Sequence, residues 1–212
     1  MKLCMELLML LLGGFLWAQE SQPFHRAEED REITYWMLDP ASSQFRFSHD
    51  FTISRPGQKY AHSWVRKGST VSDDQTFIDL DTGKKLKTKK VTGKEVNELG
   101  YYEEATDPDD VVVQGELLQP VPVGGTVRIR VMETYTDKEH YYVDKSGDLV
   151  WDRTFGRPRN ILTLPAGWML VSCTFPAIIT QDAEGRIVLQ LNNPRNDEIH
   201  VIVHARKRPA AG

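Results

Sequence analysis

The chain has 212 residues, of which 40% are hydrophobic and 26% are charged, and its formal net charge is −4. This mildly acidic balance argues against a nucleic-acid-binding role, because contact with phosphates requires a basic face. Of the two cysteines, Cys173 alone lies outside the N-terminal apolar segment, so the main body forms no internal disulfide and depends on apolar burial.

Residues 1–18 have the features of a secretory signal peptide. An apolar core follows the positive Lys2, and Ala18 supplies the small residue at the cleavage point. The core is shorter than the ~20 residues of a membrane-spanning helix. The alternative, a buried N-terminal helix, is disfavoured because polar residues follow it. We therefore predict a secreted or periplasmic protein without a membrane span after cleavage, in which residues 19–32 form a flexible polar lead-in.

From residue 33 onward the hydrophobic pattern has a period of two, which is typical of strands with one buried face. The alternation is clearest over residues 45–53 and 126–135. Further strands are predicted at residues 60–64, 77–80, 85–91, 111–118, 141–143, 149–155, 160–164, 169–174, 178–180, 186–191 and 199–205. Glycine and proline fall between these runs, as expected for strands. The segment from Gly93 to Leu99 is the one candidate for a helical turn, too short to matter for the fold.

These strands predict an all-β fold with a single domain over residues 33–206, followed by a flexible tail at 207–212. Many short strands with turns every ten residues or so are typical of a sandwich. We expect a sandwich or a saddle-shaped pair of curved, mostly antiparallel sheets.

The histidines and carboxylates give weak indications of chemistry. His200 and His204 have the spacing of two zinc ligands on a helix, but on a strand they lie roughly 13 Å apart, too far to share one ion. His49 and His62 either meet across neighbouring strands or lie on a partly exposed sheet face. The acidic residues around Asp107 are read as a solvated loop rather than a calcium site. We predict no metal and no other cofactor.

The aromatic residues are the stronger indication of a binding surface. The candidates are Trp36, Trp64, Tyr101, Tyr102 and Trp151. On an exposed sheet face such rings stack against sugars or anchor a protein partner, whereas others of the set will fill the core. We therefore predict an exported, non-enzymatic binding or accessory module for a protein or glycan of the cell envelope. The sequence does not indicate the oligomeric state.

A hydrolase is the alternative function. Glycoside hydrolysis requires two facing carboxyl groups. Neighbouring strands offer Glu116, Glu133, Asp148 and Asp152 for such a pair, acting on a glycan or a peptide.

Two segments, Leu117 to Tyr135 and Leu162 to Trp168, resemble the N-terminal β-domain of zinc aminopeptidases of the aminopeptidase N and glycyl aminopeptidase kind. The resemblance implies a saddle-like β-sandwich used for docking or for shaping a substrate site. The zinc motif His-Glu-x-x-His is absent from the sequence, so no residue inherits a catalytic role. The chain is also similar to stand-alone exported bacterial β-proteins without a known activity.

Overall fold

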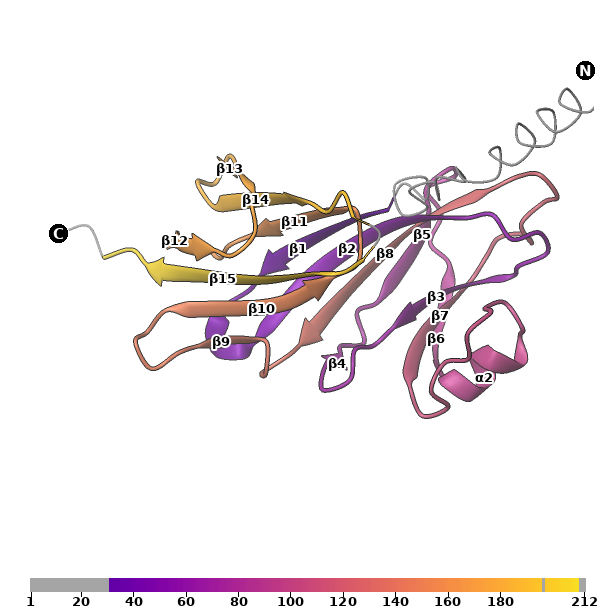
Figure 1. Cartoon of the computed structure of the whole chain (residues 1–212). Helices are drawn as coiled ribbons and strands as arrows, with labels where there is room; N and C mark the ends of the chain where they lie inside the picture. The colour runs from indigo at the N-terminus through magenta and orange to yellow at the C-terminus, as the bar shows by residue number, and fades with distance from the viewer. Residues whose placement is uncertain (1–30, 196, 210–212) are drawn as a thin grey trace, which may run out of the picture.

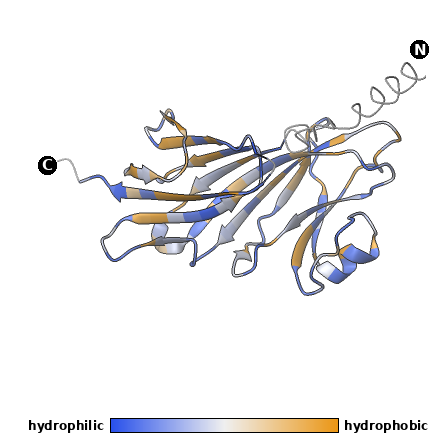
Figure 2. Ribbon diagram, viewed as in Figure 1, coloured by the Kyte–Doolittle hydropathy of each residue, from blue (hydrophilic) through white to orange (hydrophobic). Residues whose placement is uncertain are grey.

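The computed structural model describes residues 31–195 and 197–209 (Figure 1). The predicted signal peptide, nearly all of the predicted lead-in and the last three residues of the predicted tail lie outside this range. Strand β1 (Glu32–Met37) and strand β8 (Val127–Thr136) bury every second side chain, as the period of two predicted. Figure 2 shows hydrophobic residues concentrated on the strands, whereas hydrophilic residues dominate the short helix.

One large sheet forms the first layer. Its strand order is β13-β14-β11-β1-β2-β8-β4, and β5 also pairs with β8. The bounds not yet given are β2 (Gln44–Ile53), β4 (Thr70–Val71), β5 (Thr76–Asp79), β11 (Arg159–Thr163), β13 (Ile178–Gln181) and β14 (Ile187–Asn192). The pair β1–β11 is parallel, and the other pairs in this sheet are antiparallel.

Two smaller antiparallel sheets form the second layer. The four-stranded sheet has the order β12-β15-β10-β9, and the three-stranded sheet has the order β3-β7-β6. Their bounds are β12 (Trp168–Cys173), β15 (Ile199–Lys207), β10 (Leu149–Phe155), β9 (Tyr141–Val143), β3 (Tyr60–Trp64), β7 (Val111–Glu116) and β6 (Lys87–Thr92). The predicted all-β class with mostly antiparallel sheets is confirmed, and the second layer is divided into two sheets.

Both small sheets cover the same face of the large sheet. Phe47 lies opposite Tyr35 on one neighbouring strand and opposite Glu133 on the other, so these three side chains share a face. Tyr35 meets Trp151 of β10, with ring centroids 5.0 Å apart. The hydroxyl of Ser63 on β3 donates to Glu133 at 3.0 Å. One continuous apolar core therefore joins the three sheets.

The segment predicted as a helical turn forms a capped α-helix, α2 (Gly93–Glu98). Thr92 is its N-cap, and the side chains of Thr92 and Glu95 form a reciprocal capping box that satisfies the first backbone N–H groups. The helix lies beside the three-stranded sheet, and Val96 packs in a small cluster with Val91 and Val112 (Figure 1). A 3-10 turn, η1 (Pro40–Ser42), joins β1 to β2. Neither of these elements nor any other helix of the described residues has the length and apolarity to cross a membrane.

Candidate binding site

Three of the five predicted aromatic residues come together in one open recess. Trp64 ends strand β3, and Tyr101 and Tyr102 lie in the loop that follows α2. The rings of Trp64 and Tyr102 meet edge to face, with centroids 5.0 Å apart. The recess has a volume of about 630 Å³ and is lined by Arg55, Trp64, Tyr101, Tyr102, Glu103, Glu104, Ala105 and Thr106. We call it the aromatic recess.

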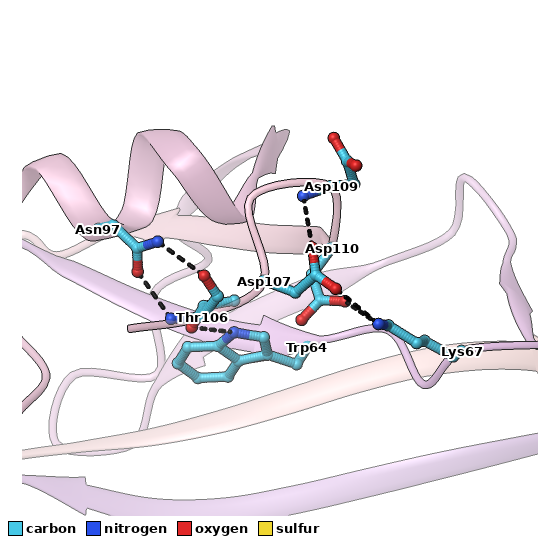
Figure 3. Close-up of polar contacts among 7 residues, drawn as sticks. All are labelled: Trp64, Lys67, Asn97, Thr106, Asp107, Asp109 and Asp110. Carbon is cyan, nitrogen blue, oxygen red and sulfur yellow. Dashed lines mark hydrogen bonds and ion pairs between the residues drawn. The ribbon is translucent and has the colours of Figure 1, made fainter. Parts of the chain in front are cut away.

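The loop that carries the two tyrosines is tied down from both sides (Figure 3). The side-chain amide of Asn97 on α2 donates to the carbonyl of Thr106 at 2.7 Å and accepts from its N–H at 2.8 Å. The indole N–H of Trp64 donates to the Thr106 hydroxyl at 3.2 Å. Asp107, which follows Thr106 in this loop, forms an ion pair of 2.7 Å with Lys67, which follows β3. The loop is therefore fixed to α2 and to the chain around β3.

A glycine allows the loop to approach the helix. Gly93 is the first residue of α2, and its N–H donates to the carbonyl of Asp110 at 2.8 Å. A Cβ atom at this position would lie 1.9 Å from the carbonyl oxygen of Asp107. No side chain fits there without moving the backbone, so this glycine is required for the position of the loop.

The buried side chain of His62 forms a hydrogen bond with Tyr102. Nε2 of His62 lies 3.1 Å from the amide oxygen of Gln114, so Nε2 carries the hydrogen and Nδ1 accepts from the Tyr102 hydroxyl at 2.9 Å. Burial lowers the pKa of His62, against the opposing hydrogen bond to Gln114. Burial also raises the pKa of Tyr102 to about 12. Both side chains are therefore neutral at pH 7, and the hydrogen bond persists.

Charged groups form the edge of the aromatic recess. Arg55 donates to the backbone carbonyl of Tyr101, and the hydroxyl of Tyr101 accepts from the N–H of Lys59 at 3.1 Å. These contacts hold the Tyr101 ring in place. Glu103 and Glu104, predicted as part of a solvated acidic loop, are exposed and line the same recess. The site thus combines ring surfaces with both donors and acceptors.

The other two predicted aromatic residues lie elsewhere. Trp151 is fully buried and packs against Tyr35 and Phe155, so the prediction of a surface role for Trp151 is wrong. Alternation did not reveal this, because the four-stranded sheet places the Trp151 face of β10 against the large sheet. Trp36 is partly exposed on β1 and does not line the aromatic recess.

The structure adds Arg55, His62 and Thr106 to the site, none of which was predicted as a binding residue. A sequence signal existed for one of them, because His62 and Trp64 are two residues apart on a strand and share a face. Arg55 lies in the connection before β3, and Thr106 is 42 residues from Trp64, so no periodic pattern pairs either residue with Trp64.

Among the described residues, no three or more histidine, cysteine, aspartate or glutamate side chains are grouped so that they could hold a metal ion. Asp107 is engaged by Lys67 and by the N–H of Asp109. His200 lies on strand β15, as predicted, and pairs with Asp152.

Two of the four carboxylates considered for hydrolysis form ion pairs. Asp148 forms a bidentate ion pair with Arg206, and Asp152 pairs with His200. Glu116 is exposed at the end of β7. Glu133 is buried, and burial raises its pKa to about 7 even though the Ser63 hydroxyl donates to it.

Comparison with known proteins gives matches among solved structures alone. No family model matches the chain, and no curated protein matches it. An M1 zinc metallopeptidase from Deinococcus radiodurans matches with 12% identity and a TM-score of 0.48, over 82% of this chain and 41% of that protein. An aminopeptidase N family protein from Idiomarina loihiensis matches with 10% identity and a TM-score of 0.45, over 82% of this chain and 29% of that protein.

Both matching proteins are zinc aminopeptidases or related proteins of the kind that the two sequence segments resemble. The chain spans less than half the length of either matching protein. These matches assign no function to any residue of this chain.

Proposed function

We propose that the protein is an exported, non-enzymatic binding module that holds a glycan in the aromatic recess. The observation that carries this proposal is the convergence of Trp64 and Tyr102, which are 38% and 40% exposed, in one recess with charged groups at its edge. Exposed aromatic rings offer an apolar surface to the C–H face of a sugar ring. Arg55, Glu103 and Glu104 supply donors and acceptors for its hydroxyl groups.

The rigidity of the recess supports a glycan more than a protein partner. The contacts of Asn97 with Thr106 and of His62 with Tyr102 fix the rings before any ligand arrives. A prearranged site loses less conformational entropy on binding. A protein partner would require a broad contact area of about 800 Å² on each side, whereas a recess of about 630 Å³ falls in the range of small-ligand sites, about 300 to 1,000 Å³.

Oligosaccharide arrays followed by calorimetry test this function with the whole chain. We expect Trp64→Ala and Tyr102→Ala each to weaken glycan binding by about tenfold or more, as loss of a stacking ring does. Tyr142→Ala is the matched control, because Tyr142 is 38% exposed on the four-stranded sheet. Equal binding by all three variants, or binding to a protein alone, would refute the glycan proposal.

The proposal that the protein is exported rests on its sequence, and it can be tested without any binding measurement. A protein recovered from the medium or the periplasm should have lost residues 1–18, which mass spectrometry detects. A cell-associated protein that retains its N-terminus would contradict export.

A hydrolase remains the second candidate because of Glu133. A carboxyl group with a pKa of about 7 has the value suited to proton transfer near neutral pH. Its neighbour Ser63 lines a second cavity, so a substrate bound there would lie near the pair. Hydrolysis of a glycan or peptide by the purified chain, abolished in Glu133→Gln, would favour this alternative over the binding module.

A further inference from the structure

Strand β13 is the last strand of the large sheet on one side, and it exposes apolar side chains. All four of its residues are exposed, and Ile178 and Ile179 are 61% and 53% exposed. Among the described residues, β13 pairs with β14 alone. The strand lies at the same end of the molecule as β12, the edge strand of the four-stranded sheet (Figure 1). We call strand β13 the open edge.

The apolar core is uncovered at the open edge. Ile179 lies directly opposite Leu189 of β14, so the two side chains share a face of the large sheet. Leu189 is fully buried, which identifies this face as the one that the second layer covers. The exposure of Ile179 therefore shows that the second layer ends before it reaches β13. Phe175 and Ile187, which pack against the core nearby, are themselves only partly buried.

The backbone of β13 presents hydrogen-bonding groups at the open edge. The N–H of Asp182 donates to the carbonyl of Arg186 at 3.1 Å, which closes the turn between β13 and β14. Bonded and non-bonded pairs alternate along an antiparallel ladder. Thr180 therefore turns its N–H and C=O toward β14, whereas Ile179 and Gln181 turn theirs outward. Such a row of outward groups is a template for one more strand.

The open edge lacks the charges that usually keep an edge strand from pairing. The sequence from Trp168 to Gln181 contains no aspartate, glutamate, lysine or arginine, and β14 contains none either. The charged residues of the intervening turn pair with one another, since Arg186 contacts Asp182 at 2.7 Å and Glu184 at 3.3 Å. By contrast, the edge strand β6 carries three exposed lysines, a feature that discourages pairing.

A second copy of this chain matches the open edge in charge and in geometry. The chain has a net charge of −4, so two copies repel each other unless they meet through an uncharged surface. Two identical strands in antiparallel pairing are related by a two-fold axis, so the donors of each strand meet the acceptors of the other. One such contact covers the open edges of both copies at once.

We propose that two copies of the chain form a dimer through antiparallel pairing of their β13 strands, with Ile179 of each copy at the two-fold axis. In this register the outward backbone groups of Ile179 bond to those of the second copy, and Gln181 lies opposite Ala177. The two Ile179 side chains meet on the core side and cover the uncovered end of the core. The large sheets of the two copies thereby become one continuous sheet.

Sedimentation equilibrium of the whole chain tests the proposal. We expect a concentration-dependent dimer and no larger species, because a two-fold contact closes on itself. Ile179→Lys should weaken dimerisation by about tenfold or more, since it places like charges together at the axis. Val143→Lys is the matched control and should dimerise as the original chain does. Val143 is 44% exposed on β9, which is an edge strand of the four-stranded sheet.

Gln181→Pro tests the backbone pairing separately, because it removes an outward N–H and keeps both isoleucines. Proline is tolerated on an edge strand where its missing N–H would face solvent, and we again expect about tenfold weaker dimerisation. Circular dichroism verifies that each variant is folded.

Trp64→Ala should dimerise normally, so the failure of the glycan site would leave this proposal intact. The dimer is refuted if the original chain is a monomer at about 100 µM, including a monomer that pairs with a strand of another protein. Assembly beyond two copies would also refute it, as would equal weakening by Val143→Lys and Ile179→Lys.

Discussion

The hydroxyl of Tyr102 lies 2.9 Å from Nδ1 of His62, and this contact joins the surface of the aromatic recess to a buried side chain of strand β3. Gln114 on the neighbouring strand fixes the opposite side of the imidazole at 3.1 Å. The exposed ring of Tyr102 is therefore positioned by a chain of neutral hydrogen bonds that begins in the core. Such a chain keeps a surface side chain in one orientation.

Removing the Tyr102 hydroxyl should weaken this connection without removing the ring. We expect Tyr102→Phe to lower the free energy of unfolding by about 1 kcal/mol, because a buried acceptor on His62 loses its donor. Urea denaturation measures the change, and Tyr142→Phe is the control, because Tyr142 is an exposed residue of β9. An unchanged stability would mean that the hydrogen bond contributes nothing to the fold.

The close approach of Gly93 to the loop makes this glycine sensitive to any side chain. Gly93→Ala should destabilise the chain by about 1–3 kcal/mol, because the new Cβ would lie 1.9 Å from the Asp107 carbonyl oxygen. Hydrogen exchange should show lost protection in the loop of residues 99–110 before the rest of the molecule. Lys94→Ala, one residue further and exposed, should leave both measurements unchanged.

The two layers also meet at a glycine on β7. A Cβ atom on Gly115 would lie 2.3 Å from Cδ2 of Phe77 on the large sheet. We expect Gly115→Ala to cost about 1–3 kcal/mol, and Phe77→Leu to recover part of this loss in the double variant. Denaturation of the four chains gives the coupling. Additive effects would show that the alanine is accommodated by some other movement.

Glu133 predicts a specific pH dependence of stability. Its pKa rises from 4.5 to about 7 on folding, so the folded state holds a proton that the unfolded state releases. The resulting stabilisation is fully present below pH 4.5 and is lost as the pH rises through 7. The full effect is about 3 kcal/mol, of which most disappears between about pH 5 and pH 8.

Glu133→Gln removes this titration and keeps the shape of the side chain. The difference in unfolding free energy between the original chain and the variant should therefore shift by about 2 kcal/mol in favour of the variant from pH 5 to pH 8. Urea denaturation at a series of pH values measures it. Parallel curves for the two proteins would show that Glu133 is already ionised in the fold.

Part of the site could be predicted from the residues themselves. Trp64, Tyr101 and Tyr102 were expected on a binding surface, and they line one recess. The helix that holds their loop also had a signal, since Thr92 and Glu95 have the spacing of a capping box. The short length of this helix suggested a turn that does not matter for the fold. The contacts of Asn97 and Gly93 nevertheless hold the loop with the two tyrosines in place.

The sequence alone determined that this chain forms strands, because the alternation of side chains is a local property of the backbone. Only the tertiary structure decided which faces are covered. Trp151 and Trp64 lie on similar alternating strands, yet one is buried by the large sheet and the other is exposed at the end of β3. The aromatic recess also depends on tertiary structure, since Trp64 and Tyr102 come from segments far apart in the chain, which no local pattern brings together.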